Sequence, residues 1–233
     1  MAARRECGTV KTELRLLATA TTGRYLLEPA ESPGAPLLVG FHGYAQRAEQ
    51  LLEELRALPG AGAWTRVAVQ ALHRFYRPKD QEVVGSWMTS LDRDSAIADN
   101  LAYVQRVLAE LRAEGRNGPL VFAGFSQGAA MAWRAAAGCR PCQGLLVLGG
   151  DLPADVARSE GLALPPVLLG RGADDRYYTA PQLERDLASL EGLGAAVEVV
   201  RFPGGHEWAP GFQAAAGRFL ERVRLSPAPR PGG

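Results

Sequence analysis

Five residues, Gly124-Phe125-Ser126-Gln127-Gly128, stand between a run of apolar residues and an alanine-rich stretch. The run before them is typical of a buried strand, and the stretch after them is typical of a helix. A strand that turns sharply into a helix brings two backbones together, which favours a glycine two residues on either side of the serine. The pattern therefore predicts that Ser126 is exposed at the edge of a sheet, with its hydroxyl near the positive end of a helix.

A serine in that position can act as the nucleophile of an acyl transfer reaction. The next backbone N–H, that of Gln127, would bind the oxyanion that develops on the carbonyl. The same five-residue pattern also arises by chance in a chain with 27 glycines, where it marks an ordinary strand-to-helix turn. In a sheet of the hydrolase type, an acid and then a histidine follow the serine along the chain. The rest of the sequence therefore tests the motif.

Length and composition limit the classes of protein that this chain can represent. Its 233 residues fit one α/β domain, expected over residues 1–225, with a disordered tail over residues 226–233. A net charge of +1 gives no excess of positive charge for binding nucleic acid, and no apolar run is long enough to span a membrane. Three cysteines and the lack of a secretory leader point to the cytoplasm as the expected compartment.

Predicted strands and helices alternate along most of the chain. Apolar runs predict buried strands at residues 36–41, 64–69, 120–123, 144–148, 166–169 and 195–202. Helical spacing of apolar residues predicts helices at 46–58, 94–114, 180–190 and 208–222. Residues 9–27 are expected to form an opening antiparallel hairpin at one sheet edge, and residues 71–93 a long connection near the site. The alternation predicts a mainly parallel sheet with helices on both faces and ligands at the carboxyl ends of its strands.

Only three histidines are available as a general base, namely His42, His73 and His206. His206 follows the last predicted strand and is preceded by two glycines, so it is the best placed, with helix capping as the alternative role. His42 ends an early strand and is expected to be structural, beside a loop in which the N–H of Tyr44 supplies a second oxyanion donor. His73 is expected to pack in a loop or to face solvent.

Two adjacent carboxylates, Asp174 and Asp175, are candidates for the acid that orients His206. They lie in the turn after a predicted strand, and adjacent side chains point in different directions, so only one can reach the imidazole. Asp151 follows the preceding strand and is the fallback candidate. Spacing by itself does not choose between Asp174 and Asp175.

Together these residues resemble the phospholipase/carboxylesterase family of α/β-hydrolases, which includes acyl-protein thioesterases and small bacterial carboxylesterases. The likeness runs from about residue 36 to residue 220, and it implies a single-domain α/β-hydrolase fold. It rests on four matches, which occur in the family's order: Phe41-His42-Gly43, Gly124-Phe125-Ser126-Gln127-Gly128, Gly172-Ala173-Asp174-Asp175 and Gly205-His206. The family's acid stands three residues after the glycine of its His-Gly-x-x-Asp turn, which implies Asp175 here.

The chain departs from the family pattern around the acid. Arg171 replaces the usual histidine before the glycine, and Tyr177-Tyr178 replaces a small aliphatic pair. The family also carries a tryptophan before the long helix, and Trp87 resembles it. We expect Trp87, Tyr177 and Trp208 to line the substrate pocket, although Trp87 could equally pack its loop onto the sheet.

The resemblance implies a serine hydrolase that cleaves carboxylic esters or thioesters of small to medium acyl groups through an acyl-enzyme on Ser126. In this scheme His206 takes the serine proton and Asp175 orients the imidazole. Neither a metal nor an organic cofactor is implied, and the expected partner is a small-molecule substrate. Whether the chain is a monomer or a homodimer stays open. Alternatives are a peptidase or lactone hydrolase on the same fold, and a ligand-binding relative without turnover.

Overall fold

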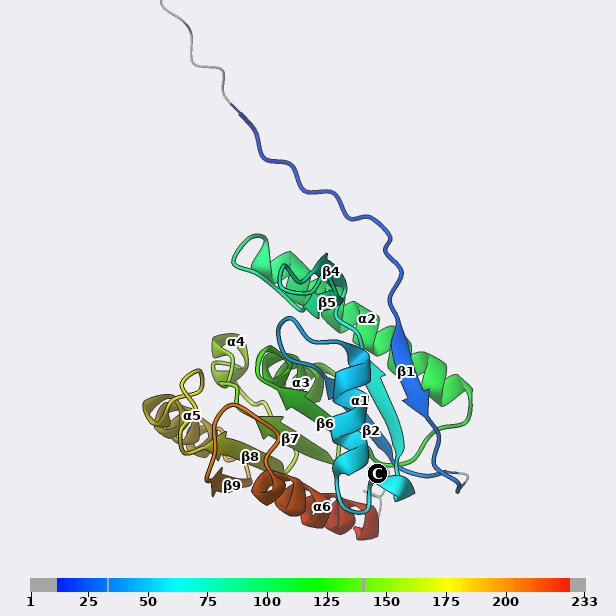
Figure 1. The fold of residues 1–233 in the computed structure, drawn as a ribbon, viewed down its shortest axis with the longest axis vertical. Helices are drawn as coiled ribbons and strands as arrows, with labels where there is room; N and C mark the ends of the chain where they lie inside the picture. The colour runs from blue at the N-terminus through cyan, green and yellow to red at the C-terminus, as the bar shows by residue number, and fades with distance from the viewer. Residues whose placement is uncertain (1–11, 33, 140, 227–233) are drawn as a thin grey trace, which may run out of the picture.

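A seven-stranded sheet forms the centre of the computed structural model, which describes residues 12–32, 34–139 and 141–226. Its strands are β1 (Tyr25–Glu28), β2 (Leu37–Phe41), β3 (Thr65–Val69), β6 (Leu120–Phe125), β7 (Gly144–Leu148), β8 (Val167–Gly172) and β9 (Val197–Phe202). They lie in the order β1-β3-β2-β6-β7-β8-β9, and only β1 runs antiparallel to its neighbour (Figure 1). The sheet is therefore mainly parallel, as predicted.

Helices cover both faces of this sheet, which confirms the predicted α/β class. The helices are α1 (Ala48–Ala57), α2 (Arg93–Ala113), α3 (Gln127–Gly138), α4 (Ala154–Ala157), α5 (Ala180–Gly192) and α6 (Pro210–Leu225), with a short 3₁₀ helix η1 (Ala61–Ala63). Because successive strand residues point to opposite faces, Leu38 and Val121 pack with α1 and α6, whereas Val39 and Phe122 pack with α2, α3 and α5. All residues of β2, β6 and β7 are buried, which accounts for their continuous apolar runs.

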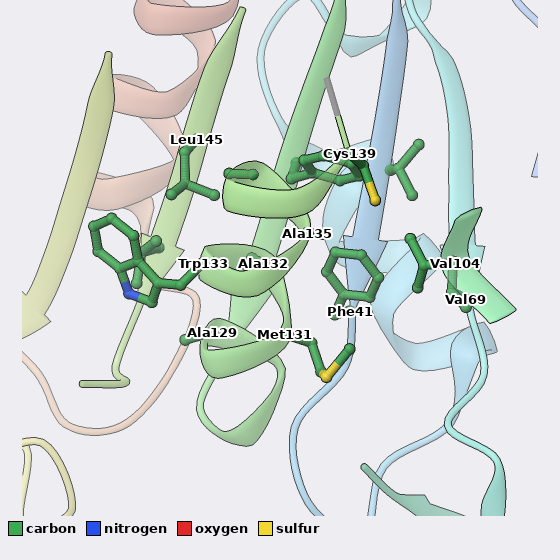
Figure 2. Packing of buried hydrophobic residues seen from close by; sticks show 14 of the residues in the cluster. Phe41, Val69, Val104, Ala129, Met131, Ala132, Trp133, Ala135, Cys139 and Leu145 are labelled. Carbon is green, nitrogen blue, oxygen red and sulfur yellow. The ribbon is translucent and has the colours of Figure 1, made fainter. Parts of the chain in front are cut away.

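Helix α3 starts immediately after the serine turn and lies close against the sheet. Figure 2 shows its alanines, including Ala129 and Ala132, along the helix axis, with Trp133 beside Leu145 on one flank. Small side chains allow the helix to approach the strands, and the larger side chains fill the space at its sides. The alanine-rich sequence thus holds the helix start, and with it Ser126, rigidly at the end of β6.

The described residues do not form the predicted N-terminal hairpin over residues 9–27. Residues 12–24 contain no strand, the first part of this segment extends away from the domain, and only β1 joins the sheet, antiparallel to β3 at the edge (Figure 1). Leu14, Leu16 and Leu17 are exposed there. A strand needs a partner strand along its length, whereas the hydrogen bonds that described residues make to this segment are isolated ones near its end, to the carbonyl oxygens of Thr22 and Arg24. Its β-branched composition therefore did not suffice. Residues 9–11 lie outside the described residues.

The antiparallel hairpin of the fold lies elsewhere, within the connection over residues 71–93. There β4 (His73–Tyr76) pairs with β5 (Val83–Ser86) as a small second sheet next to α2 (Figure 1). Neither strand was predicted, because residues 71–93 form a long polar and aromatic connection without clear periodicity. Of the predicted tail, residues 226–233, only Ser226 is described, as the residue that ends α6. No helix among the described residues is both long and apolar enough to cross a lipid bilayer.

Candidate active site

Ser126 occupies a strained turn between β6 and α3. Its φ of 54° and ψ of −121° are unusual for a residue other than glycine, so the surrounding structure must hold this conformation. A Cβ at Gly124 would lie 2.3 Å from the carbonyl oxygen of Gly128, and a Cβ at Gly128 would lie 2.1 Å from that of Phe41. Both flanking glycines are therefore required by close contact between backbones. The turn leaves the Ser126 side chain beside a cleft at the carboxyl end of the sheet.

A histidine and a carboxylate meet at this same edge. His206, in the loop after β9, donates a hydrogen bond from Nδ1 to Oδ2 of Asp175, in the loop after β8, over 2.8 Å. The Asp175 side chain is only 1% exposed, whereas that of His206 is 17% exposed. The other oxygen, Oδ1, accepts the backbone N–H groups of Tyr177 and Tyr178 at 2.8 and 2.9 Å. Asp175, not Asp174, therefore contacts the imidazole, while Asp174 and Asp151 are exposed.

The imidazole of His206 lies next to the serine turn. Its ring packs against Phe125, the residue before Ser126, at a centroid distance of 4.7 Å, and against Tyr177 at 5.0 Å. The Ser126 hydroxyl itself makes no hydrogen bond to any described residue in this structure. Hydrogen bonds between a nucleophile and its base are commonly long in the absence of substrate and tighten when substrate binds. The arrangement thus brings the three predicted residues to one sheet edge.

His42 supports the loop that follows β2. Its Nε2 accepts the backbone N–H of Ala71 at 3.1 Å, and since that group can only donate, the ring proton must be on Nδ1. Nδ1 accordingly donates to the carbonyl oxygen of Gly43 over 2.7 Å. The N–H of Gly43 donates to Oε1 of Gln46, also over 2.7 Å. His42 is therefore a structural residue that sets the peptide before Tyr44.

Burial of His42 has a consequence for stability. Desolvation lowers the pKa of this ring from 6.5 to about 4. Between about pH 6.5 and pH 4 the unfolded chain binds a proton at this site that the folded chain does not. We therefore expect His42 to reduce the free energy of unfolding by up to about 3 kcal/mol as the pH falls through this window. Urea unfolding of the wild type and of His42→Gln across this range measures the effect.

The His42→Gln protein is expected to show a flatter dependence of its free energy of unfolding on pH between 6.5 and 4. Equal slopes in the two proteins would contradict the prediction. NMR titration of the His42 ring protons in the wild type checks the same pKa without any substitution.

Two backbone N–H groups are available near the serine turn. That of Gln127 begins α3, where a helix leaves its first donors without intrahelical partners. That of Tyr44 lies in the loop held by His42, and neither group donates a backbone hydrogen bond within the described part of the chain. The side chain of Gln127 is turned the other way, accepting the N–H of Trp87 at 2.8 Å and donating to the carbonyl oxygen of Met88 at 2.8 Å.

A cleft of about 370 Å³ opens beside Ser126. Its walls combine the start of α3, the loop before α2, the loop after β7 and the acid loop. The lining residues are Met88, Thr89, Ser90, Arg93, Ser126, Gln127, Ala130, Gly149, Gly150, Asp151, Tyr177 and Tyr178. Of the predicted pocket residues, Tyr177 lines this cleft. Trp208 is not among the lining residues, and its ring packs against Phe125 and Phe212.

Trp87 is a correction to the predicted pocket. It is fully buried, and its indole N–H donates to the carbonyl oxygen of His42 over 2.8 Å. Asn100 in turn donates to the carbonyl oxygen of Trp87 over 2.8 Å. The indole ring of Trp87 is large and apolar, and it packs beneath the loop after β2, away from solvent and from the cleft. The alternative of a tryptophan that packs its loop onto the sheet fits the structure.

Several residues that shape the site carried no sequence signal. Gln70 contacts Nε2 of His42 through its amide and accepts the N–H of Ala48, which ties α1 to the loop after β2. The backbone N–H groups of Ala45 and Gly85 bond to the carbonyl oxygens of Gly85 and Gln46, so β5 braces the same loop. The third histidine, His73, is exposed on β4. No group of three His, Cys, Asp or Glu side chains within the described ranges could hold a metal ion.

Comparison with solved structures identifies proteins of the same fold. Neither a protein-family model nor a curated protein matches the chain in sequence. Esterase PE8 is 25% identical, with a TM-score of 0.73 over 87% of this chain and 100% of its own. Acyl-protein thioesterase 2 of Zea mays is 19% identical, with a TM-score of 0.71 over 87% of this chain and 100% of its own.

A phospholipase/carboxylesterase from Dyadobacter fermentans is 21% identical, with a TM-score of 0.66 over 88% of this chain and 99% of its own. Below 25% identity such likeness establishes the fold alone, and esterase PE8, at 25% identity, shares that fold over its whole length. The comparisons therefore confirm the predicted resemblance of this chain to the phospholipase/carboxylesterase family of α/β-hydrolases.

Proposed function

We propose that this chain is a carboxylesterase-type serine hydrolase that cleaves esters or thioesters of small to medium acyl groups. The observation that carries the proposal is the buried Asp175 carboxylate bonded to His206, whose ring packs against the residue before Ser126. The resemblance to esterase PE8 supports the same class of reaction. The three side chains then act as nucleophile, base and orienting acid.

In the first half of the reaction, Oγ of Ser126 attacks the carbonyl carbon while Nε2 of His206 takes the hydroxyl proton. The N–H groups of Tyr44 and Gln127 stabilise the oxyanion that forms. The tetrahedral intermediate collapses, His206 gives its proton to the departing alcohol or thiol, and the acyl group remains on Ser126. Water then attacks the acyl-enzyme with His206 as base, which releases the carboxylic acid and restores the serine hydroxyl.

A fluorophosphonate probe and a panel of substrates test this function. The probe should label the wild type but not Ser126→Ala, while Ser90→Ala, which removes the other serine of the cleft, should still be labelled. The panel compares aryl esters of two to twelve acyl carbons with acyl thioesters, lactones and a peptide anilide. Labelling that persists in Ser126→Ala, or turnover confined to the peptide, would overturn the proposal. Labelling without turnover of any substrate would indicate a ligand-binding relative.

We infer that the acyl group enters the cleft lined by Met88, Ala130 and Tyr177. Ala130 lies four residues after Ser126, one turn along α3 on the same face. We therefore expect Ala130→Leu to fill acyl space and to lower kcat/KM for an octanoyl ester by about 10-fold or more. For an acetyl ester, kcat/KM should stay within about 3-fold of the wild-type value.

Ala109→Leu is the matched control, since it makes the same change at an exposed position of α2. It should leave the ratio of octanoyl to acetyl turnover unchanged. An unchanged ratio in Ala130→Leu as well would place the acyl group outside this cleft.

A further inference from the structure

Arg171 is buried at the end of β8 without an acidic partner. It is 9% exposed, and it forms no ion pair with the described residues. A buried cation is costly unless its donors are satisfied. The donors of Arg171 bond to backbone carbonyl oxygens. Nε donates to that of Tyr178 over 2.7 Å, and Nη2 donates to those of Ala173 and Asp175, each over 3.3 Å. All three acceptors belong to the loop that carries the Asp175 carboxylate.

Tyr178 makes three hydrogen bonds that hold this loop, two of them to residues outside it. Its backbone N–H donates to Oδ1 of Asp175, and its carbonyl oxygen accepts Nε of Arg171. Its phenol donates to Oδ2 of Asp186 on α5 over 2.8 Å, and the whole side chain is 1% exposed. The same Asp186 oxygen accepts the N–H of Leu152, in the loop after β7. Tyr178 thus connects the acid loop to a second loop of the cleft.

The consequence for Asp175 is a carboxylate with one permitted orientation. Two N–H groups occupy Oδ1, so Oδ2 faces His206. Those two N–H groups come from Tyr177 and Tyr178. The Arg171 guanidinium donates to the carbonyl oxygens of Tyr178 and Asp175, and these bonds fix the backbone of the same loop. A planar guanidinium with a fixed fork of donors suits this task, because it can hold several carbonyl oxygens at once.

We propose that Arg171 and Tyr178 are positioning residues that orient the Asp175 carboxylate toward His206, and hence set the turnover rate without contacting substrate through the guanidinium. The proposal rests on the function proposed above. It assigns a role to both departures from the family pattern, since Arg171 and the Tyr177-Tyr178 pair form one hydrogen-bonded unit around the acid. Displacing a catalytic group by about 1 Å can cost about 100-fold in rate, which sets the scale of the effect.

Arg171→Gln removes the charge and most of the donors. We expect kcat to fall by about 10- to 100-fold while KM stays within about 2-fold, because ground-state binding does not involve this side chain. Arg171→Lys keeps the charge but loses the fork, so it should recover only part of kcat. Tyr178→Phe keeps both backbone groups and loses only the bond to Asp186, so kcat should fall by about 2- to 10-fold.

The low-field NMR resonance of the Nδ1 proton of His206 reports the bond to Asp175 directly. It should shift or broaden in Arg171→Gln and should be partly restored in Arg171→Lys. A purely structural role would lower thermal stability without moving this resonance. Arg66→Gln supplies the control for loss of a half-buried guanidinium away from the cleft. Arg66 lies on β3, its side chain is 14% exposed, and it donates to the carbonyl oxygen of Ala61 while also pairing with Glu28. The Arg66→Gln protein should lose stability and keep both kcat and the resonance.

Wild-type values of kcat and of the Nδ1 resonance in Arg171→Gln overturn the proposal, and so does an equal loss of kcat in Arg66→Gln. If Arg171→Gln does not fold, Arg171→Lys and Tyr178→Phe decide the question, because the proposal requires a lower kcat in both, and an unchanged KM in Arg171→Lys. Failure of the proposed function is separate. It shows as a wild type without turnover that depends on Ser126, whereas failure of this inference leaves that turnover intact.

Discussion

Ser126→Ala is expected to lower kcat for ester hydrolysis by about 10⁶-fold, the largest effect of any single substitution in this chain. Alanine removes the oxygen that forms the acyl-enzyme, and no neighbouring side chain can replace it in the same turn. The two N–H groups of Tyr44 and Gln127 remain, so residual turnover above the rate in water is expected from oxyanion binding alone. Initial-rate measurements with an activated aryl ester determine the ratio of kcat values.

The fold should tolerate this substitution, since the hydroxyl of Ser126 makes no hydrogen bond with the described residues. Alanine also keeps the Cβ, which the strained backbone at residue 126, with its φ of 54°, already accommodates. Circular dichroism and thermal unfolding should therefore match the wild type closely. A Ser126→Ala protein that keeps more than about one hundredth of wild-type kcat would exclude Ser126 as the nucleophile.

Asp175→Asn is expected to lower kcat by about 10⁴-fold, the second largest effect. Because the N–H groups of Tyr177 and Tyr178 occupy Oδ1, the amide oxygen of asparagine should take that place. The NH₂ group would then face Nδ1 of His206 and force the ring proton onto Nε2. An imidazole protonated at Nε2 cannot accept the proton of Ser126, so the substitution selects the inactive tautomer.

Asp174→Asn makes the same chemical change one residue away, at an exposed side chain without a contact to His206. It should leave kcat within about 2-fold of the wild type, since exposed charges of this kind contribute little. Similar losses in both variants would mean that net charge, and not the bond to His206, governs the rate. A loss confined to Asp174→Asn would reverse the assignment of the acid.

Much of the central sheet could be predicted from the sequence. The predicted strand over residues 144–148 matches β7, and the helix predicted over residues 180–190 lies within α5 (Ala180–Gly192). These elements follow from side-chain periodicity, which is a local property of the chain. The two short strands β4 and β5 were not predicted, because each has four residues without clear alternation of polar and apolar side chains, and half of the eight residues are exposed.

The candidate site divides in a similar way. The glycines around Ser126 marked the turn because close contact between backbones excludes a Cβ there, and this requirement is visible in five consecutive residues. The choice between Asp174 and Asp175 was not available from spacing, since adjacent side chains point apart and only the folded loop decides which one faces His206. Trp87 was assigned to the pocket by resemblance, and its burial beneath His42 reversed that assignment.

By itself, the sequence determined the class of fold, the order of the main strands and helices along the chain, and the sharp turn at Ser126. Each of these depends on residues within a few positions of one another. Only the tertiary structure decided which carboxylate meets His206, how Arg171 and Tyr178 hold it, and which side chains line the cleft. Those outcomes depend on contacts between loops that follow different strands, whose relative directions arise only when the sheet brings their ends together.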